Sequence, residues 1–405
     1  MTRLFGVSGV FMLSPVRRGP PSLGILILAV ASANLGLSLL SPVITQLRQD
    51  LLATADEAQL VLSGFMMSVA LAQLLSGSLS DRFGRRYVLL TGAVVFSLGG
   101  VGAMLAGSVG QLVGFRVLQG VGAAACLTMG RVIVNDSFEG ADAARKMSIV
   151  SSAQAIVPLL GFGFGGVIAE FIGWRGSIAI MVFGGLLILW LAARFIAESR
   201  QGEPVPFQLR SLIVTYGQLA LNPGVRNHGL TSGFAVGMFF AMGGTMPYEF
   251  ARLGASPIEF GLLFATTSVG YILGNLVNGL FVGRLGLGGM AMLGSLLTML
   301  VPATMLTGHF TDLLTPVRLS ALCFCFGFCN GLVIANAMIC SMRAAGRNSG
   351  AGTGLLGAMQ MLIGGVGGSI IIGLGGAETF TATAAGLLVM SMMGAVTSFL
   401  GLKLR

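Results

Sequence analysis

Long apolar runs, separated by short polar turns, repeat along almost the whole chain. A run of about 20 apolar residues is long enough to cross a bilayer as a helix. The predicted spans are 22–45, 58–79, 87–106, 110–135, 146–171, 176–197, 228–250, 257–282, 287–306, 317–341, 349–374 and 380–402. The pattern therefore predicts an all-α membrane protein with twelve transmembrane helices.

One long polar break divides these runs into two groups of six. It extends from Glu198 to Asn227 and contains prolines and arginines. Within it, residues 209–221 are expected to form an amphipathic helix at the membrane surface. The predicted organisation is a cytoplasmic N-terminal segment (1–21), a first six-helix bundle (22–197), a cytoplasmic linker (198–227) and a second six-helix bundle (228–405).

The composition excludes a soluble globular protein. The 405 residues are 55% hydrophobic and 9% charged, whereas soluble domains are about one quarter charged. The formal net charge is +9, but the basic residues are scattered over loops, which excludes a nucleic-acid partner. They divide about 16 to 4 between the two sides of the predicted membrane. Because Lys and Arg accumulate in cytoplasmic loops, both termini are expected in the cytoplasm.

The cysteines give no support for a metal site or a redox cofactor. All five lie in apolar stretches, and none forms a C-x-x-C pair. They are therefore expected to be small buried side chains. We expect no cofactor, no metal and no enzymatic activity.

The turn between the second and third predicted spans reads Gly-Ser-Leu-Ser-Asp-Arg-Phe-Gly-Arg-Arg from position 77 to position 86. A basic cytoplasmic anchor would explain its arginines but not Asp81. The acid, the glycines and the basic pair have the spacing of the signature loop of the major facilitator superfamily, which the chain resembles. The resemblance implies two six-helix bundles that expose a central binding site to either side of the membrane in turn.

The resemblance also implies a charge cluster that controls this alternation. Asp81, Arg85 and Asp136 would hold the cytoplasmic ends of the first bundle together, and Asp81 would face the N-terminal end of helix eleven in the outward-open state. Such a cluster favours one of two conformers. The predicted gating residues are Gly77, Asp81, Arg82, Gly84, Arg85, Arg86 and Asp136.

Span four carries a second resemblance, because Arg116, Gln119 and Gly120 match another signature of the superfamily. An arginine inside a span is costly and normally faces a cavity or a carboxylate. The alternative is that Arg116 extends to the nearby interface. In the superfamily this arginine is linked to proton transfer, so Arg116 is a candidate for proton coupling, and Gly120 is expected to allow close helix packing.

Span five resembles the antiporter signature of the Bcr/CflA-type drug exporters, in which two prolines precede a pair of glycines. Pro158 matches the first proline, but Phe162 replaces the second. Close helix packing is still expected from Pro158, Gly161, Gly165 and Gly166. The replacement leaves open whether the protein is an antiporter, because the expected kink is lost or displaced.

The centres of the predicted spans carry no acid. Drug exporters of this branch commonly have an acid in span one, where this chain has Ser38. The best carboxylate for proton coupling is Glu249, at the outer end of span seven, although a solvated helix end is an equally good interpretation. The polar residues expected to line the cavity are Asn34, Ser38, Gln119, Gln154, Asn330, Asn336 and Gln360. Each of them is also suited to a hydrogen bond between helices.

The 22 methionines and 26 phenylalanines favour an apolar and adaptable cavity. Together with such a cavity, the resemblance to the Bcr/CflA-type exporters implies a monomeric exporter of apolar or cationic small molecules in the bacterial inner membrane, driven by proton antiport and conferring drug resistance. A facilitator or importer of one metabolite is the alternative, supported by Phe162 and by the missing acid in span one. A sensor without transport is a third possibility, because the second-half copy of the signature loop, at 279–286, lacks the acid.

Overall fold

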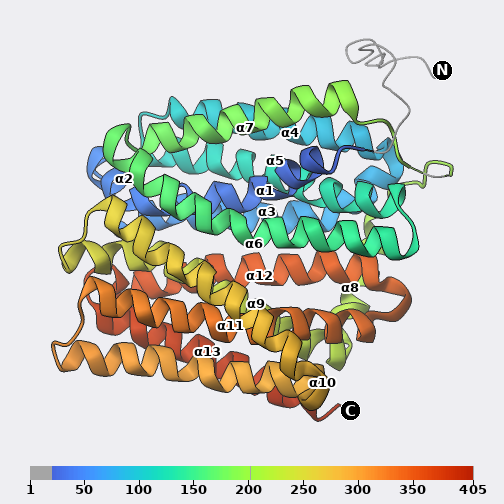
Figure 1. Ribbon diagram of the computed structural model, residues 1–405. Helices are drawn as coiled ribbons and strands as arrows, with labels where there is room; N and C mark the ends of the chain where they lie inside the picture. The colour runs from blue at the N-terminus through green and yellow to red at the C-terminus, as the bar shows by residue number, and fades with distance from the viewer. Residues whose placement is uncertain (1–20, 201, 405) are drawn as a thin grey trace.

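The computed structural model describes residues 21–200 and 202–404, and every regular element in these residues is a helix (Figure 1). The predicted N-terminal segment 1–21 lies outside the described residues except for Pro21. The first half contains α1 (Leu23–Ser38), η1 (Ser41–Val43), α2 (Ile44–Asp50), α3 (Ala55–Phe83), α4 (Arg85–Met104), α5 (Val109–Ser137), α6 (Gly140–Phe171) and α7 (Trp174–Phe195). The linker helix and the second half contain α8 (Leu209–Leu221), α9 (Pro223–Arg252), α10 (Pro257–Phe310), α11 (Pro316–Ala345), η2 (Gly346–Asn348), α12 (Ser349–Ile371), η3 (Ile372–Gly376) and α13 (Phe380–Leu402).

These helices confirm the predicted all-α membrane fold. Ten of the described helical segments are long and apolar enough to cross a membrane. One of them, α10, has 54 residues and contains two spans, because Gly286 interrupts it with a φ of 71° and a ψ of 166°. The 30 residues of α9 supply the remaining span. At a rise of about 1.5 Å per residue, α9 is long enough to cross the hydrocarbon core.

Local sequence signals explain several helix boundaries. The first turn of α3 has a capping box, in which the Thr54 side chain accepts from the Glu57 amide and the Glu57 carboxylate accepts from the Thr54 amide. The same arrangement joins Ser256 and Glu259 at the start of α10. Gly84 separates α3 from α4 with a φ of 100°, a conformation that favours glycine.

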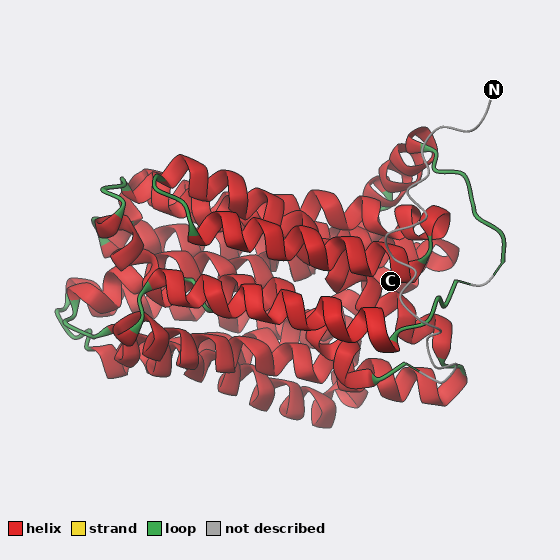
Figure 2. Cartoon of the chain, turned by 90° about the horizontal axis from the view of Figure 1, so that it is seen from above, coloured by secondary structure: helices red, strands yellow, loops and turns green. Residues whose placement is uncertain are grey.

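The long helices run side by side and their connections lie at the two ends (Figures 1 and 2). We call the end that carries Arg85 the Arg85 end, and the opposite end the Trp174 end. In Figure 1 the helices of the first half lie above those of the second half. Helix α8 lies at the Arg85 end, because its Tyr216 lines one cavity together with Asp81 and Arg85.

Each half has its own apolar core, with contributions across the boundary. One core consists mainly of residues from α1 to α7, and the other consists of residues from α9 to α13 together with Phe162 of α6. Many contacts between the halves join α3 to α12 and α6 to α10. The boundary between the halves is therefore where a cavity would be shared by both.

Candidate functional site

A cavity of about 230 Å³, which we call the main cavity, lies between the two halves. Helices α1, α5 and α6 line it from the first half, and α9, α10, α11 and α12 line it from the second. Aromatic rings of Phe239, Phe240 and Tyr271 form part of its wall, with Met338 and Met361. The cavity therefore offers apolar, adaptable surfaces interrupted by a few polar groups.

Four of the seven predicted cavity residues line this cavity. They are Asn34, Gln154, Asn330 and Gln360. The Asn34 amide donates to the Gln154 carbonyl (3.3 Å), and the Gln360 amide donates to the Ser232 hydroxyl (2.8 Å). These polar groups are consequently held in place by neighbouring helices.

The other three predicted cavity residues are buried elsewhere. The Ser38 hydroxyl donates to the Asn34 carbonyl one turn earlier in α1 (2.9 Å). The Asn336 amide donates to Asn278 Oδ1 (2.6 Å), which joins α11 to α10. Gln119 accepts from Arg116 (2.6 Å) inside the first half. For these residues the prediction of a cavity position is corrected, because Ser38 and Asn336 bond within or between helices and Gln119 bonds to Arg116 in the core of the first half.

Arg131, the charged residue among the described lining of the main cavity, was not among the residues predicted from the sequence. Its Nη2 donates to Gln154 Oε1 (2.7 Å). No described carboxylate lies within 4.0 Å of its guanidinium nitrogens. A basic residue inside the predicted span 110–135 was the available signal, because such residues usually mark a functional site.

The main cavity continues toward the Arg85 end. A second cavity of about 340 Å³ is lined by Asp81, Arg85 and Tyr216, and it shares Arg131 and Thr353 with the first. The Tyr216 hydroxyl donates to the Leu74 carbonyl (3.0 Å) and so ties α8 to α3 beside this second cavity. Burial raises the pKa of Tyr216, which keeps the phenol protonated as a donor.

At the Trp174 end the two halves are in close contact. A Cβ atom on Gly166 of α6 would lie 2.5 Å from the Pro257 carbonyl oxygen of α10, and one on Gly261 would collide with the Phe162 carbonyl. The Ser41 hydroxyl of η1 donates to the Gly243 carbonyl of α9. These contacts close the main cavity at the Trp174 end, whereas toward the Arg85 end it adjoins the second cavity.

Phe162, which replaces the second proline of the antiporter signature, belongs to this closure. Its ring meets Phe264 edge-to-face at 4.7 Å and Phe239 at 5.9 Å between ring centroids. Phe239 and Pro158 line the main cavity. The phenylalanine thus joins the two halves next to the cavity, where a proline would have no ring to offer.

The predicted packing glycines of α6 divide between two partners. A Cβ on Gly161 would meet Ser38, and one on Gly165 would lie 3.2 Å from Leu39, so both approach the α1 region. Gly166, in contrast, faces the second half. Gly120 of α5 lies against the Phe65 carbonyl of α3.

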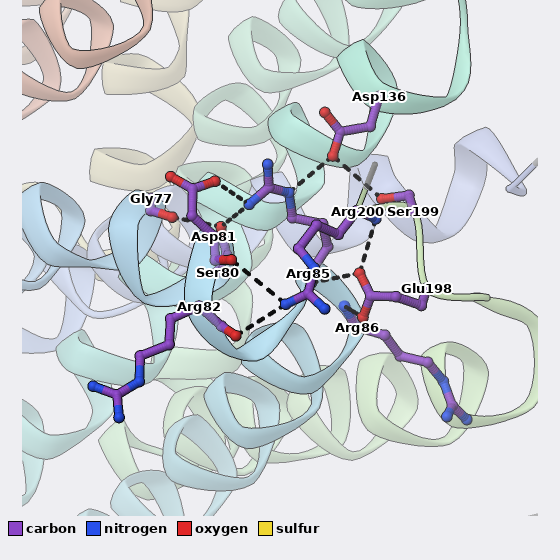
Figure 3. A network of polar contacts seen from close by, with 10 residues as sticks. All are labelled: Gly77, Ser80, Asp81, Arg82, Arg85, Arg86, Asp136, Glu198, Ser199 and Arg200. Atoms are coloured by element: carbon purple, nitrogen blue, oxygen red, sulfur yellow. Dashed lines mark hydrogen bonds and ion pairs between the residues drawn. The ribbon is translucent and has the colours of Figure 1, made fainter. Parts of the chain in front are cut away.

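The charged residues at the Arg85 end form a network (Figure 3). Arg85 Nε donates to Asp136 (2.8 Å), and Nη1 donates to Asp81 (2.5 Å) and to the Ser80 hydroxyl (2.8 Å). The Ser80 hydroxyl donates in turn to the Gly77 carbonyl (2.6 Å). The predicted cluster of Asp81, Arg85 and Asp136 is therefore assembled from α3, α4 and α5, all in the first half.

Glu198, which follows α7, belongs to this network although it was not among the predicted gating residues. Its carboxylate accepts from the backbone amides of Arg85 (2.8 Å), Arg86 (3.2 Å) and Arg200 (2.9 Å). It thereby caps the N-terminus of α4, where a negative charge is favourable. A Cβ on Gly84 would displace this carboxylate, and the positive φ of 100° at Gly84 itself favours glycine.

The remaining basic residues of the signature loop make separate contacts. Arg82 stacks over the Phe83 ring at 5.1 Å, and the Arg86 guanidinium donates to the Ala193 carbonyl of α7 (2.8 Å). Arg200 donates to the Arg82 carbonyl (2.9 Å). The linker after α7 is thus fastened to the loop between α3 and α4.

Arg116 lies in the core of the first half, with 0% of its surface exposed. It donates to the Gly36 carbonyl of α1 and to Gln119, and its guanidinium lies 4.0 Å from the Phe65 ring centroid. Arg116 neither lines the main cavity nor reaches the interface. This position joins α1, α3 and α5 and offers no described carboxylate as a proton partner.

Glu249 is buried at the Trp174 end, with 4% of its surface exposed. Arg252 Nη2 lies 2.7 Å from its carboxylate, one turn later in α9. It does not line the main cavity. The two candidates for proton coupling therefore lie outside the cavity, and neither position is that of a solvated helix end.

Comparisons with known proteins agree with this architecture. The sequence model of the Major Facilitator Superfamily matches residues 26–369. The chain is 28% identical to the transporter YdgK of Bacillus subtilis over 90% of this chain and 91% of that protein. It is 24% identical to a bicyclomycin resistance protein homolog of Haemophilus influenzae, over 83% and 85% of the two chains. It is 32% identical to a chloramphenicol resistance protein of Pseudomonas aeruginosa, over 59% and 57%.

Among solved structures, a D-xylose–proton symporter superposes with a TM-score of 0.72 and 16% sequence identity, over 94% of this chain and 97% of that one. At this identity the likeness establishes the fold alone.

Proposed function

The chain belongs to the major facilitator superfamily, and on this premise we propose that it exports small amphipathic molecules across the bacterial inner membrane by alternating access. The superfamily consists of transporters with small-molecule substrates, so membership supports transport as the general activity. We further propose that it works as a monomer. Both termini would lie in the cytoplasm, which the distribution of basic residues supports.

The observation that carries this proposal is the cavity between the halves, which continues to the Arg85 end and is closed at the Trp174 end. With the Arg85 end in the cytoplasm, this is a conformation that loads substrate from inside the cell. The relatives named for resistance to chloramphenicol and bicyclomycin favour export as the direction. The apolar wall of the cavity suits amphipathic substrates better than sugars.

The charge network suits the gating role that we propose for it. Asp81 lines the second cavity together with Gly350 and Ala351, which belong to the first turn of α12. Closing this cavity would move the Asp81 carboxylate toward the positive N-terminal end of α12. Asp81 would then interact less with Arg85 and more with the N-terminal end of α12, while Arg85 keeps its bond to Asp136. The same groups can therefore serve both conformers.

Proton antiport is the coupling that the sequence resemblance implies. Glu249 is the candidate carboxylate, but it is ion-paired with Arg252 and lies outside the main cavity. Because Glu249 does not line the main cavity, its proton cannot compete directly with a bound substrate. Coupling through Glu249 would therefore have to act on the closure of the Trp174 end.

Export is tested by measuring the retention of a broad panel of fluorescent dyes and antibiotics in energised, pump-deficient cells that express the protein. Cells with the protein should retain less of at least one compound, and an uncoupler should restore retention. The matched control is the Gly166→Leu variant at equal expression, which should be unable to close its Trp174 end. Equal retention with and without the protein across the panel would refute export.

A facilitator or importer of one metabolite is the second candidate. The main cavity, as far as it is described, has no carboxylate lining, and this favours a transporter without proton exchange. Substrate counterflow in liposomes that is unchanged by a protonophore would support it. Any saturable flux would exclude a sensor that has lost transport.

A further inference from the structure

We propose that the main cavity binds a monovalent organic anion, with Arg131 as its counter-ion. This inference rests on the proposed role of the cavity as the transport site and specifies the substrate class. It replaces the cationic substrates that the sequence alone suggested.

Arg131 dominates the electrostatics of the cavity. It is the charged residue among the described lining of the main cavity. Within the described residues it forms no ion pair, and its hydrogen bond is the one to Gln154 Oε1. A guanidinium has five N–H donors in a planar fork. Most of these donors are therefore available to a ligand in the cavity.

An unpaired cation between apolar walls is unfavourable, and a bound anion offsets that cost. A carboxylate or sulfonate suits the guanidinium best, because it can accept two parallel N–H bonds. A cationic ligand in the same cavity would be repelled, because the walls screen charge less than water does.

The position of Arg131 also predicts the orientation of the ligand. It lies at the junction of the two cavities, which both include it in their lining. Phe239 and Phe240 lie in the main cavity, beside the closure at the Trp174 end. The anionic group would thus face the Arg85 end, and the apolar body would lie against the aromatic rings.

The charge on Arg131 supplies a driving force that needs no proton. The loaded cavity is neutral, because the anion compensates the guanidinium, so its outward movement transfers no net charge. The empty cavity is positive, and its return toward a negative cytoplasm is favoured by the membrane potential. Each cycle exports one negative charge, and 100 mV would sustain a concentration ratio of about 50-fold.

Binding by the purified full-length protein tests this inference with three probes that share a naphthalene ring: naphthalene-2-sulfonate, naphthalene-2-sulfonamide and naphthyl-2-trimethylammonium. We expect the sulfonate to bind at least about tenfold more tightly than the sulfonamide, as charge-assisted bonding to arginine implies. Arg131→Gln should abolish this preference while retaining the sulfonamide affinity, which also shows that the variant is folded. Arg131→Lys should keep part of the preference.

Arg194→Gln is the matched control, because Arg194 is an exposed arginine in the last turn of α7. It should leave the preference unchanged. Equal binding of sulfonate and sulfonamide, a preference for the ammonium probe, or no binding of any probe would overturn the inference. A sulfonate preference that survives Arg131→Gln would also overturn it.

Flux in proteoliposomes separates this inference from the proposed function. Sulfonate movement should follow a potassium–valinomycin potential and should persist in strongly buffered vesicles with equal pH on both sides of the membrane. Sulfonate flux that requires a pH gradient would overturn the proposed driving force. Transport of the neutral or cationic probe without sulfonate transport would overturn the anion site and leave export standing. Arg131-dependent binding without any flux would refute transport and leave the anion site standing.

Discussion

The two ends of the interface between the halves are built from different kinds of residue. At the Trp174 end, glycines and aromatic rings bring α6 into close contact with α10. At the Arg85 end, ion pairs join α3, α4 and α5 of the first half to one another, and the second cavity separates them from α12. At the Trp174 end the two halves are thus held together by closely fitting side chains. At the Arg85 end the ion pairs stay within the first half and do not cross to the second.

This difference suggests how the transporter changes conformation. Closure at the Trp174 end depends on the fit of small residues and requires no ion pair between α6 and α10, so it can separate without leaving a buried charge unpaired. The charged groups at the Arg85 end keep partners within the first half while the cavity is open. When the cavity closes, these charged groups can approach the N-terminus of α12 while still paired with one another, so no single charge has to leave water without a partner.

The largest predicted effect comes from filling the close contact at the Trp174 end. Gly166→Leu would place side-chain atoms where the Pro257 carbonyl lies, because even a Cβ atom there would be 2.5 Å from that oxygen. Overpacking of this kind costs ~1–3 kcal/mol, and each 1.4 kcal/mol is a factor of ten. We expect substrate counterflow to fall by about a hundredfold. Spin labels on α6 and α10 should show a larger separation at this end.

Gly163→Leu is the matched control on the same helix, because a Cβ on Gly163 has no neighbour within 4 Å. It should retain counterflow within about twofold of the native protein, as surface substitutions usually do. If both variants lost activity equally, a general defect of α6 would explain the result, and the Trp174 end would no longer be a specific closure.

Sequence reasoning recovered the features that depend on local pattern. The twelve spans follow from the length of the apolar runs and α8 (Leu209–Leu221) from its amphipathic pattern, and the cluster around Arg85 followed from the resemblance to the superfamily. Glu198 was not predicted, because its partner Arg85 is 113 residues away and a carboxylate after a span looks like an ordinary linker residue. Long-range contacts of this kind require the fold.

The cavity residues show the same limit. Asn34 and Ser38 are one helical turn apart in α1, and both are polar, yet Asn34 lines the cavity while Ser38 is bonded to the α1 backbone and packed against Gly161. Whether a buried polar group faces a cavity or a neighbouring helix depends on the rotation of each helix in the bundle. The sequence does not determine that rotation to better than a residue or two.

A medium effect is predicted at the Arg85 end from Asp81→Asn. The change removes the charge that would meet the N-terminus of α12, while Arg85 keeps Asp136 at 2.8 Å. We expect turnover to slow by about tenfold, corresponding to ~1.4 kcal/mol lost in one conformer. Substrate binding should change by less than about twofold, because Asp81 does not line the main cavity. Turnover and binding are measured separately in proteoliposomes and in detergent.

The control is Asp142→Asn, because Asp142 forms an exposed pair with Lys146 (3.6 Å) at the same end. Exposed pairs of this type contribute little. Its turnover should match the native protein. Equal loss of binding and turnover in Asp81→Asn would indicate misfolding and remove Asp81 from the gate.

The smallest effect is predicted for Glu198→Gln, which tests whether the linker is an anchor or part of the gate. The glutamine keeps an oxygen that can accept from the Arg85 amide, but it loses the charge that favours the N-terminus of α4. A lost cap charge costs ~1 kcal/mol, which corresponds to a melting temperature about 2 °C lower for a protein of this size. Glu203→Gln, an exposed change in the same linker, should leave the melting temperature unaltered. Turnover of Glu198→Gln should stay within about twofold of native, since the Arg85 pairs to Asp81 and Asp136 are retained. A loss of turnover as large as that of Asp81→Asn would instead make the linker a moving part of the Arg85 end, and the charges there could no longer be treated as belonging to α3, α4 and α5 alone.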